Sequence, residues 1–144
     1  VLRLGAARLV VVDSDAARAQ AVAAALDAVY GPGRVSASAD AVAALAGASG
    51  LIHATPTGMD KLPGLPLPAD LLRPELWVAE IVYFPLDTAL LRAARARGCA
   101  TVDGGTMAAG QAIGAFELFT GRPADAARME AHLRRMLAQR ADAA

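Results

Sequence analysis

Polar, glycine and aromatic residues interrupt the sequence directly after several short apolar runs. The interruptions are Asp13-Ser14, Thr55-Pro56-Thr57, Tyr83-Phe84-Pro85 and Asp103-Gly104-Gly105. If the runs are parallel strands, these residues stand at the carboxyl ends, where open parallel sheets bind their ligands. Carboxylates, hydroxyls and glycine backbone groups are suited to holding a nucleotide. The spacing therefore predicts a nucleotide-binding site built from several loops.

Asp13 is the most informative of these positions. An acidic residue that ends the second strand of a dinucleotide-binding fold accepts hydrogen bonds from the ribose hydroxyls of adenosine. It also repels a 2′-phosphate, by about 4 kcal/mol for charges ~4 Å apart at an effective dielectric of about 20. Asp13 thus favours NAD over NADP. The alternative is that Asp13, Ser14 or Asp15 caps the following helix, and both interpretations stand. The glycine fingerprint would lie just upstream of Val1.

The other polar candidates have simpler interpretations when taken singly. His53 lies on an apolar run, so we expect a buried, hydrogen-bonded histidine rather than a proton-transfer group. Cys99 opens an apolar run and is expected in the core. Met107 and Gln111 are four residues apart and so share one helix face; alone, they indicate packing and a surface position. No Ser-His-Asp triad, carboxylate pair or metal-ligand cluster is evident, and we assign no catalytic residue.

The apolar runs alternate with segments of helix length, which predicts an α/β fold. The expected strands are Arg8–Val12, Arg34–Ala37, Leu51–Ala54, Leu76–Tyr83 and Cys99–Val102. The expected helices are Ala16–Tyr30, Ser38–Ala46 with Ser38 as its cap, Leu86–Arg97, Thr106–Phe119 and Ala124–Gln139. The proline-rich stretch Asp60–Pro74 is expected to be irregular. Because the first run is continuously apolar from Leu9, we expect a strand buried on both faces. The pattern predicts a Rossmann-like, doubly wound parallel sheet with helices on both faces.

Composition excludes several classes of function. The chain has 144 residues, enough for one domain. Its mean hydropathy is +0.39, yet no apolar run approaches the ~20 residues of a membrane span. A formal net charge of +0 leaves no basic face for nucleic acid or anionic lipid. One cysteine and two histidines exclude an internal disulfide and make a metal site unexpected. We therefore expect a soluble, cytoplasmic protein.

The beginning of the sequence indicates a fragment. It starts at Val1, and Leu2 and Leu4 before Gly5 are typical of a last helical turn closed by glycine. We expect an α/β fold truncated at its N-terminus, without its first strand and glycine loop. The predicted division is a dinucleotide-binding domain at 1–121 and a C-terminal helix at 122–144.

Three segments together resemble the shikimate dehydrogenase family. His53-Ala54-Thr55-Pro56-Thr57-Gly58-Met59 is similar to its Asn-Ala-Thr-Pro/Ser-x-Gly-Met loop. The run from Ile81 to Leu91 resembles its Val-Tyr-x-Pro-x-x-Thr-x-Leu-Leu segment. The run from Asp103 to Gly121 resembles its Asp-Gly-x-x-Met-x-x-x-Gln-Ala-x-x-Ala-Phe segment and the residues that follow. Order and spacing agree, and the resemblance covers nearly the whole chain.

The resemblance implies an enzyme that moves hydride between a nicotinamide cofactor and a ring hydroxyl of shikimate or quinate. The cofactor-binding residues it implies are Asp13, Arg18, Thr55, Pro56, Ile81, Val82, Gly104 and Met107. Asp13 and Arg18 would hold the adenosine half, as in the branch that uses NAD, so NADP is the less favoured cofactor. Thr55 and Pro56 would line the cleft, and the other four would meet the nicotinamide end. The implied substrate-binding residues are Tyr83 and Gln111.

Two departures from the family pattern affect local geometry. His53 replaces the usual Asn, and Gly105-Thr106 replaces a Leu-Gly-like pair. The family's proton-transfer Lys and Asp come from an N-terminal substrate domain, and Lys61 matches no catalytic motif. General acid–base help is worth about 10²–10⁴-fold in rate, so we expect no useful turnover from this chain alone.

The resemblance also implies partners. The last helix of the family packs toward the substrate domain, so Met129, Leu133 and Met136 would face that missing surface. A homodimer is a further assembly that the resemblance allows. Two alternatives stand beside this interpretation: a non-catalytic nucleotide-binding or regulatory module, and another two-domain dehydrogenase such as a methylenetetrahydrofolate enzyme. The run containing Met107 and Gln111 argues against the latter.

Overall fold

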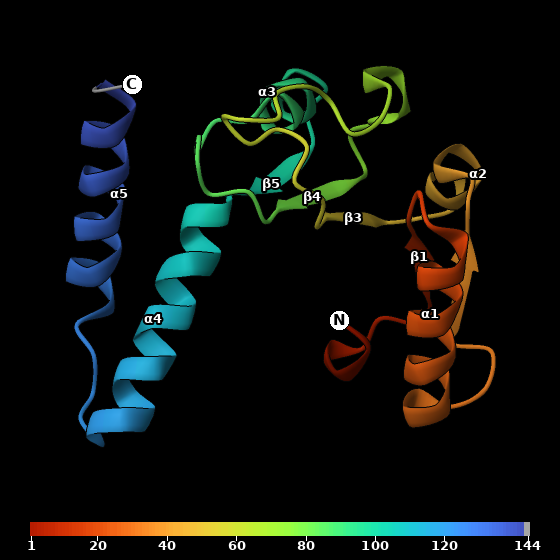
Figure 1. Cartoon of the computed structure of the whole chain (residues 1–144), viewed down its shortest axis with the longest axis horizontal. Coiled ribbons are helices and arrows are strands. Elements are labelled where there is room, and N and C mark those ends of the chain that lie inside the picture. Colours follow the sequence, from red (N-terminus) through yellow and green to blue (C-terminus); the bar gives the residue numbers. More distant parts are fainter. Residues whose placement is uncertain (143–144) are drawn as a thin grey trace. The chain divides into compact units, whose positions relative to one another are not determined.

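Parallel β-strands alternate with α-helices along the chain (Figure 1). The computed structural model describes residues 1–142 and the side chains up to residue 140. The chain forms two compact units, the N-terminal unit Val1–Ala48 and the C-terminal unit Ser49–Ala144. Hydrogen-bonded strands are ordered β1-β2 in the first unit and β3-β4-β5 in the second, and all pairs are parallel. The predicted α/β class with parallel strands is confirmed, while the division at residue 121 stays a prediction.

The N-terminal unit is a βαβ arrangement followed by a short helix. Its elements are the 3-10 helix Leu2–Leu4, β1 (Leu9–Val12), α1 (Ala16–Tyr30), β2 (Val35–Ser38) and α2 (Ala41–Ala46). Gly5 closes the first turn with a φ of 98°, in the left-handed region that glycine adopts most readily. Leu2, Ala23 and Val35 form the centre of its core. The Asp27 carboxylate accepts hydrogen bonds from the backbone N–H groups of residues 33–35, which fixes the α1–β2 connection.

Two expectations for this unit are wrong. Burial alternates along β1, so Leu9 and Val11 pack against the core while Val10 and Val12 are 40% and 39% exposed. The strand is therefore not buried on both faces. Helix α2 is capped by Asp40, whose carboxylate accepts from two backbone N–H groups of the first turn, and not by Ser38. A carboxylate next to the helix can reach those groups, whereas Ser38 ends β2.

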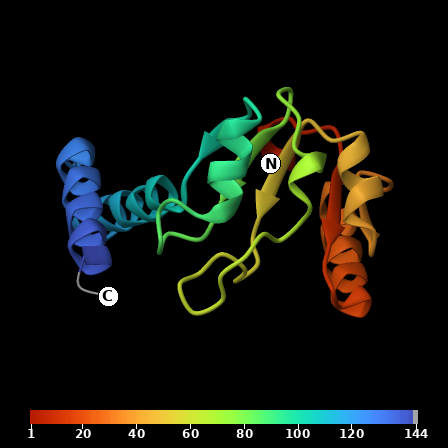
Figure 2. The same cartoon turned by 90° about the horizontal axis from the view of Figure 1, so that it is seen from above.

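The C-terminal unit holds a three-stranded sheet and three α-helices within its described residues. Its elements are β3 (Gly50–His53), the 3-10 helix Ala69–Leu71, β4 (Trp77–Glu80), α3 (Ala89–Ala96), β5 (Ala100–Val102), α4 (Gly104–Thr120) and α5 (Ala126–Asp142). Between β3 and β4 the proline-rich loop is irregular, as predicted, apart from one 3-10 turn. Figure 2 shows this yellow-green loop extending away from the strands.

Strand β4 and helix α3 are both shorter than the sequence predicts. The strand ends at Glu80 rather than Tyr83, because the Glu80 carboxylate accepts the N–H of Val82 and turns the chain. Helix α3 begins at Ala89 rather than Leu86, and its N-cap is Thr88, whose hydroxyl accepts from Leu91 N–H. A β4–α3 connection of several residues is thus available for a site.

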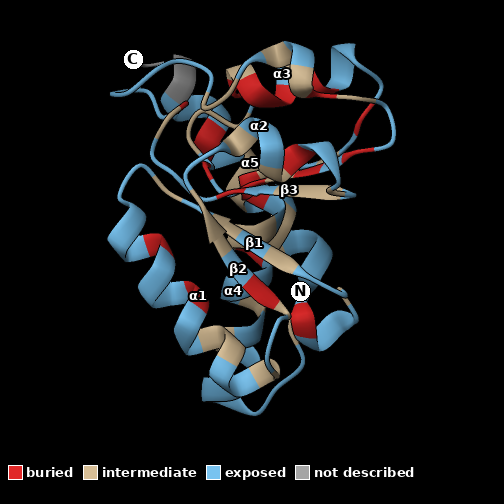
Figure 3. Ribbon diagram, turned by 90° about the vertical axis from the view of Figure 1, so that its right-hand side faces the viewer, coloured by how far each residue is buried: buried red, intermediate tan, exposed pale blue. Residues whose placement is uncertain are grey.

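The core of this unit lies between α3 and the strands. Leu90, Leu91 and Ala94 of α3 are at most 1% exposed, and Val78 of β4 is equally buried. Figure 3 shows the buried part of α3 in red. At the beginning of β3, Gly50 lies against the indole of Trp77, its partner in the strand register. A side chain at position 50 would occupy the space of that ring. Helices α4 and α5 pack against each other (Figures 1 and 2).

Candidate functional site

A pocket of about 360 Å³ lies at the carboxyl ends of β3 and β4. The loop after β3 contributes Thr55 and Pro56, and the segment after β4 contributes Ile81, Val82 and Tyr83. The structure thus brings together five of the residues that the sequence marks as candidates. Further wall residues, to which sequence reasoning assigned no role in binding, are Met59, Asp60, Lys61, Phe84 and Arg140. Arg140 lies 4.5 Å from the ring centre of Phe84, as a cation above an aromatic face.

Gly104 closes the backbone approach between α4 and the end of β4. A Cβ at this position would lie 2.6 Å from the carbonyl oxygen of Ile81 and closer still to that of Val82. Only glycine therefore lets the first residue of α4 come this near, and Gly104 is buried. Gly104 thus lies beside Ile81 and Val82, while the role given to these residues at the nicotinamide end of the cofactor stays a prediction.

Met107 and Gln111 lie further along α4 and are not part of the pocket wall. Met107 is half-buried and Gln111 is exposed. The roles given to them, beside the nicotinamide ring and at the substrate, stay predictions.

Asp13 and Arg18 lie in the N-terminal unit, after β1 and on α1. The cap of α1 is Asp15, whose carboxylate accepts from Arg18 N–H at 3.1 Å. Asp13 instead accepts the N–H of Asp15 at 2.9 Å and lies 3.6 Å from the Arg18 Nε. Capping is thus assigned to Asp15, and the Asp13 side chain is 31% exposed at the strand end. The nearby guanidinium is itself exposed, so this ion pair adds little stability.

A buried polar network stands directly behind the pocket. His53 and Glu80 are partners in the β3–β4 register, and their residues are 4% and 2% exposed. His53 Nδ1 lies 2.7 Å from Glu80 Oε1, and His53 Nε2 lies 2.6 Å from the hydroxyl of Thr55. Thr88 donates to the second carboxylate oxygen at 3.0 Å. The prediction of a buried, hydrogen-bonded His53 is confirmed; Glu80 was missed.

The charge of Glu80 follows from these contacts. Burial raises the pKa of a carboxyl group, but hydrogen bonds from His53, Val82 N–H and Thr88 outweigh it, and the pKa of Glu80 lies below its usual range. Glu80 is therefore ionised at neutral pH. An acceptor-only carboxylate requires His53 Nδ1 to carry a hydrogen, which fixes the orientation of the imidazole ring.

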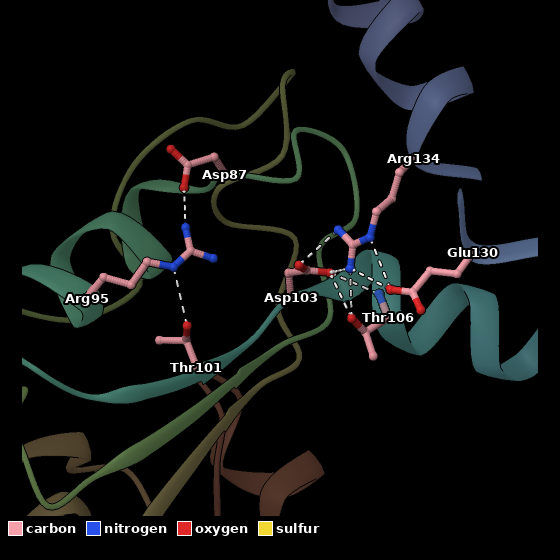
Figure 4. Close-up of polar contacts among 7 residues, drawn as sticks. All are labelled: Asp87, Arg95, Thr101, Asp103, Thr106, Glu130 and Arg134. Carbon is pink, nitrogen blue, oxygen red and sulfur yellow. Dashed lines mark hydrogen bonds and ion pairs between the residues drawn. The ribbon is translucent and has the colours of Figure 1, made fainter. Parts of the chain in front are cut away.

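A second cluster joins α5 to the beginning of α4 (Figure 4). Asp103 is the N-cap of α4 and accepts from Thr106 N–H at 2.9 Å. Arg134 donates to both carboxylate oxygens of Asp103 at 3.1 and 3.3 Å, and also to Glu130 and the Thr106 hydroxyl. Partial burial raises the pKa of Asp103, but the Thr106 N–H and the Arg134 guanidinium outweigh it and lower that pKa. Asp103 remains ionised well into acid.

The apolar residues of α5 differ in their exposure. Met129 and Leu133 are half-buried, Met136 is 53% exposed, and Leu137, not among the candidates, is buried at 8% exposure. Met129 also lines a groove with Phe116 of α4. On α4, Leu118 and Phe119 are 79% and 83% exposed. The contact of Met129, Leu133 and Met136 with a substrate domain stays a prediction.

Within residues 1–142, no helix is long and apolar enough to cross a bilayer. In the same range, no group of three or more His, Cys, Asp and Glu side chains is arranged to hold a metal ion.

Comparison with known proteins relates the chain to a family of dehydrogenases. The Shikimate 5'-dehydrogenase C-terminal domain matches residues 105–134. The chain is 56% identical to the shikimate dehydrogenase (NADP(+)) of Streptomyces avermitilis over 135 residues, which is 92% of this chain and 46% of that protein. It is 44% identical to the quinate/shikimate dehydrogenase (NAD(+)) of Corynebacterium efficiens, over 88% of this chain and 45% of that protein.

A solved structure of a related dehydrogenase has a similar fold. Quinate dehydrogenase from Corynebacterium glutamicum in complex with NAD matches with a TM-score of 0.84 and 40% identity, over 90% of this chain and 46% of that chain. The chain is thus homologous to NAD(P)-dependent dehydrogenases. It belongs to the shikimate/quinate dehydrogenase family and covers the C-terminal, cofactor-binding part of its homologues. It spans about half the length of the relatives it matches.

Proposed function

We propose that this chain is the cofactor-binding part of an oxidoreductase that transfers hydride between NAD(P) and a ring hydroxyl of shikimate or quinate, giving the 3-dehydro product. The observation that carries the proposal is the pocket at the ends of β3 and β4, lined by Thr55, Pro56, Ile81, Val82 and Tyr83. The resemblance assigns the first two of these residues to the dinucleotide cleft, the next two to the nicotinamide end and Tyr83 to the substrate. The homology of the chain supports the same assignment.

The residues of the pocket suit binding and orientation. The nicotinamide ring supplies the hydride chemistry when the cofactor is bound. The apolar side chains Ile81 and Val82 would exclude water from one side of it, and their backbone groups would hold it. The phenol of Tyr83, in a residue 50% exposed, can donate to or accept from a substrate hydroxyl. His53 and Glu80 are buried and hydrogen-bonded to each other, and we assign them no role in proton transfer.

Proton transfer is assigned to residues outside this chain. We propose that an N-terminal substrate domain supplies the general acid–base pair, as the resemblance implies. The expected result is cofactor binding without turnover of shikimate or quinate by residues 1–144 alone. Steady-state assays of this chain with both acids and both cofactors test this, and measurable turnover would contradict it.

We further propose a preference for NAD over NADP, carried by Asp13 in the N-terminal unit. Its carboxylate would accept from the ribose hydroxyls and repel a 2′-phosphate. The relatives include proteins named for either cofactor, so the preference needs a direct test. Calorimetric titration should give tighter binding of NADH than of NADPH, and Asp13→Asn should shrink the ratio. A ratio unchanged by Asp13→Asn would remove Asp13 from specificity. Failure to bind either cofactor would overturn the proposed function.

A further inference from the structure

The network behind the pocket connects the interior of the sheet to the pocket wall. His53 is the last residue of β3 and Glu80 the last of β4, and the parallel register places them opposite each other. Two residues beyond His53, Thr55 lies on the pocket wall and is exposed. A single imidazole therefore contacts a fully buried carboxylate through one nitrogen and a wall hydroxyl through the other.

The carboxylate end of this network is fixed from three directions. Glu80 accepts from His53, from the Val82 N–H at 3.1 Å and from the Thr88 hydroxyl at 3.0 Å. The three donors come from β3, from the segment after β4 and from the N-cap of α3. These three hydrogen bonds hold the Glu80 side chain in one rotamer. The hydrogen bond to Glu80 in turn fixes the position of the His53 ring.

The other end controls one side chain of the wall. His53 Nε2 and the Thr55 hydroxyl form a hydrogen bond of 2.6 Å. The same hydroxyl accepts from Thr57 N–H at 3.3 Å. Two hydrogen bonds therefore hold the hydroxyl on the protein side, and they fix Thr55 in one rotamer against the pocket.

We propose that His53 and Glu80 are positioning residues that hold Thr55 in one rotamer and thereby set the affinity of the pocket for the nicotinamide half of the cofactor. The inference rests on the proposed function, that this pocket takes that half. Because neither residue lines the pocket, their effect passes through Thr55. It should be seen with ligands that carry nicotinamide and not with ligands that end at the second ribose.

The test compares NADH with ADP-ribose, which lacks nicotinamide, by calorimetric titration of the chain. His53→Asn keeps a donor near the Nδ1 position for Glu80 but cannot reach Thr55. Thr55→Val removes the hydroxyl at an exposed position, so it remains informative if the first variant does not fold. One lost hydrogen bond should weaken NADH binding by about 3- to 10-fold, with less than about a twofold change for ADP-ribose.

The double variant and two controls sharpen the result. If the two residues act as one unit, His53→Asn with Thr55→Val should weaken NADH no more than either change alone. Thr55→Ser restores the hydroxyl and should recover most of the affinity lost in Thr55→Val. Thr120→Val removes a threonine hydroxyl that donates to Phe116 at the far end of α4. It should leave both affinities unchanged.

Each outcome decides between the claims. Equal losses for NADH and ADP-ribose, or additive losses in the double variant, would overturn the positioning role. Normal NADH binding by both single variants would also overturn it while leaving the proposed function intact. No binding of NADH or NADPH by the unmodified chain would overturn the proposed function and the inference with it.

Discussion

Glu80 and Asp103 lie at the ends of neighbouring strands, and each pairs with a nitrogen-containing side chain. One pair is buried and the other lies at the surface. Glu80 and His53 are enclosed, with side chains 0% and 4% exposed. Asp103 and Arg134 stand at the surface, with side chains 18% and 37% exposed. The buried pair joins strands and a helix cap, whereas the surface pair joins two helices. We therefore expect the buried pair to contribute more to the stability of the fold than the surface pair.

The physical reason is the reference state of each group. When a buried partner is removed, the remaining charged or polar groups stay out of water and lose their hydrogen bonds. When a surface partner is removed, water takes its place, and salt already screens the pair. Gly104 links the two clusters, because it follows Asp103 directly and lies against Val82, whose N–H is bound by Glu80.

The largest effect is expected for Glu80→Ala. This change leaves His53 Nδ1, Val82 N–H and the Thr88 hydroxyl without their acceptor inside the protein. The free energy of unfolding should fall by about 3–5 kcal/mol, measured by urea denaturation followed by circular dichroism. Glu75→Ala, at an exposed position before β4, is the control and should change it by less than about 0.5 kcal/mol. A loss below about 1 kcal/mol for Glu80→Ala would erase the contrast between the clusters.

Gly104→Ala should have the next largest effect. Its Cβ would meet two backbone carbonyls, which cannot move aside as a side chain can. We expect a loss of about 1–3 kcal/mol from overpacking and weaker NADH binding, because the end of β4 must shift. Gly110→Ala is the matched control on the same helix, where a Cβ meets nothing within 4 Å. That change should stabilise by up to about 1 kcal/mol. Equal effects at the two glycines would show that the close approach has no energetic role.

Arg134→Ala should be milder and should depend on salt. Loss of the guanidinium is expected to lower the free energy of unfolding by about 1 kcal/mol at low ionic strength. At 1 M NaCl, where screening acts over roughly 3 Å, the difference from the unmodified chain should shrink. The loss caused by Glu80→Ala should stay the same at both salt concentrations. If the loss of unfolding free energy in Arg134→Ala were the same at both salt concentrations, the Asp103–Arg134 pair would behave like the buried pair, contrary to this prediction.

The smallest effect concerns acid stability. The folded state lowers the pKa of Asp103 and Glu80 below their ordinary values of 3.8 and 4.5. The unfolded chain therefore binds protons first as pH falls, so the stabilisation is complete above these ordinary values and is lost as pH drops through the lower folded pKa. In Asp103→Asn, the decline of stability below about pH 4 should be shallower. Urea titrations between pH 6 and pH 3 measure this, and an unchanged decline would contradict it.

Local patterns were sufficient for much of this molecule. Alternation of apolar runs and helix-length segments located each β-strand and α-helix of the described residues. Strand-end chemistry marked Thr55, Pro56 and Tyr83 in the pocket, and the family resemblance added Ile81 and Val82. The predicted boundaries were wrong where a side chain binds the backbone. Glu80 ends β4 earlier than predicted, and Asp40 rather than Ser38 caps α2. Each depends on which of several neighbouring polar groups reaches the backbone, which spacing alone does not determine.

The two clusters were missed because their partners are distant in sequence. Glu80 pairs with His53 only through the β3–β4 register, and Asp103 meets Arg134 only when α5 packs on α4. One signal was present: a glutamate inside an apolar strand is almost never buried without a partner. Combined with the histidine predicted to be buried and bonded, it could have suggested the pair. The wall residues Lys61 and Arg140 had no comparable signal.

The contact of Gly50 with Trp77 gives this protein an optical probe at one defined place. Trp77 is the only tryptophan in the sequence, so all indole fluorescence comes from the edge where β3 meets β4. Its ring rests on a residue without a side chain and is part of a residue 41% exposed. Separation of the two strands would leave the indole surrounded by water and shift its emission to longer wavelength. The emission therefore records the state of the strand pair that carries His53 and Glu80, without any added label.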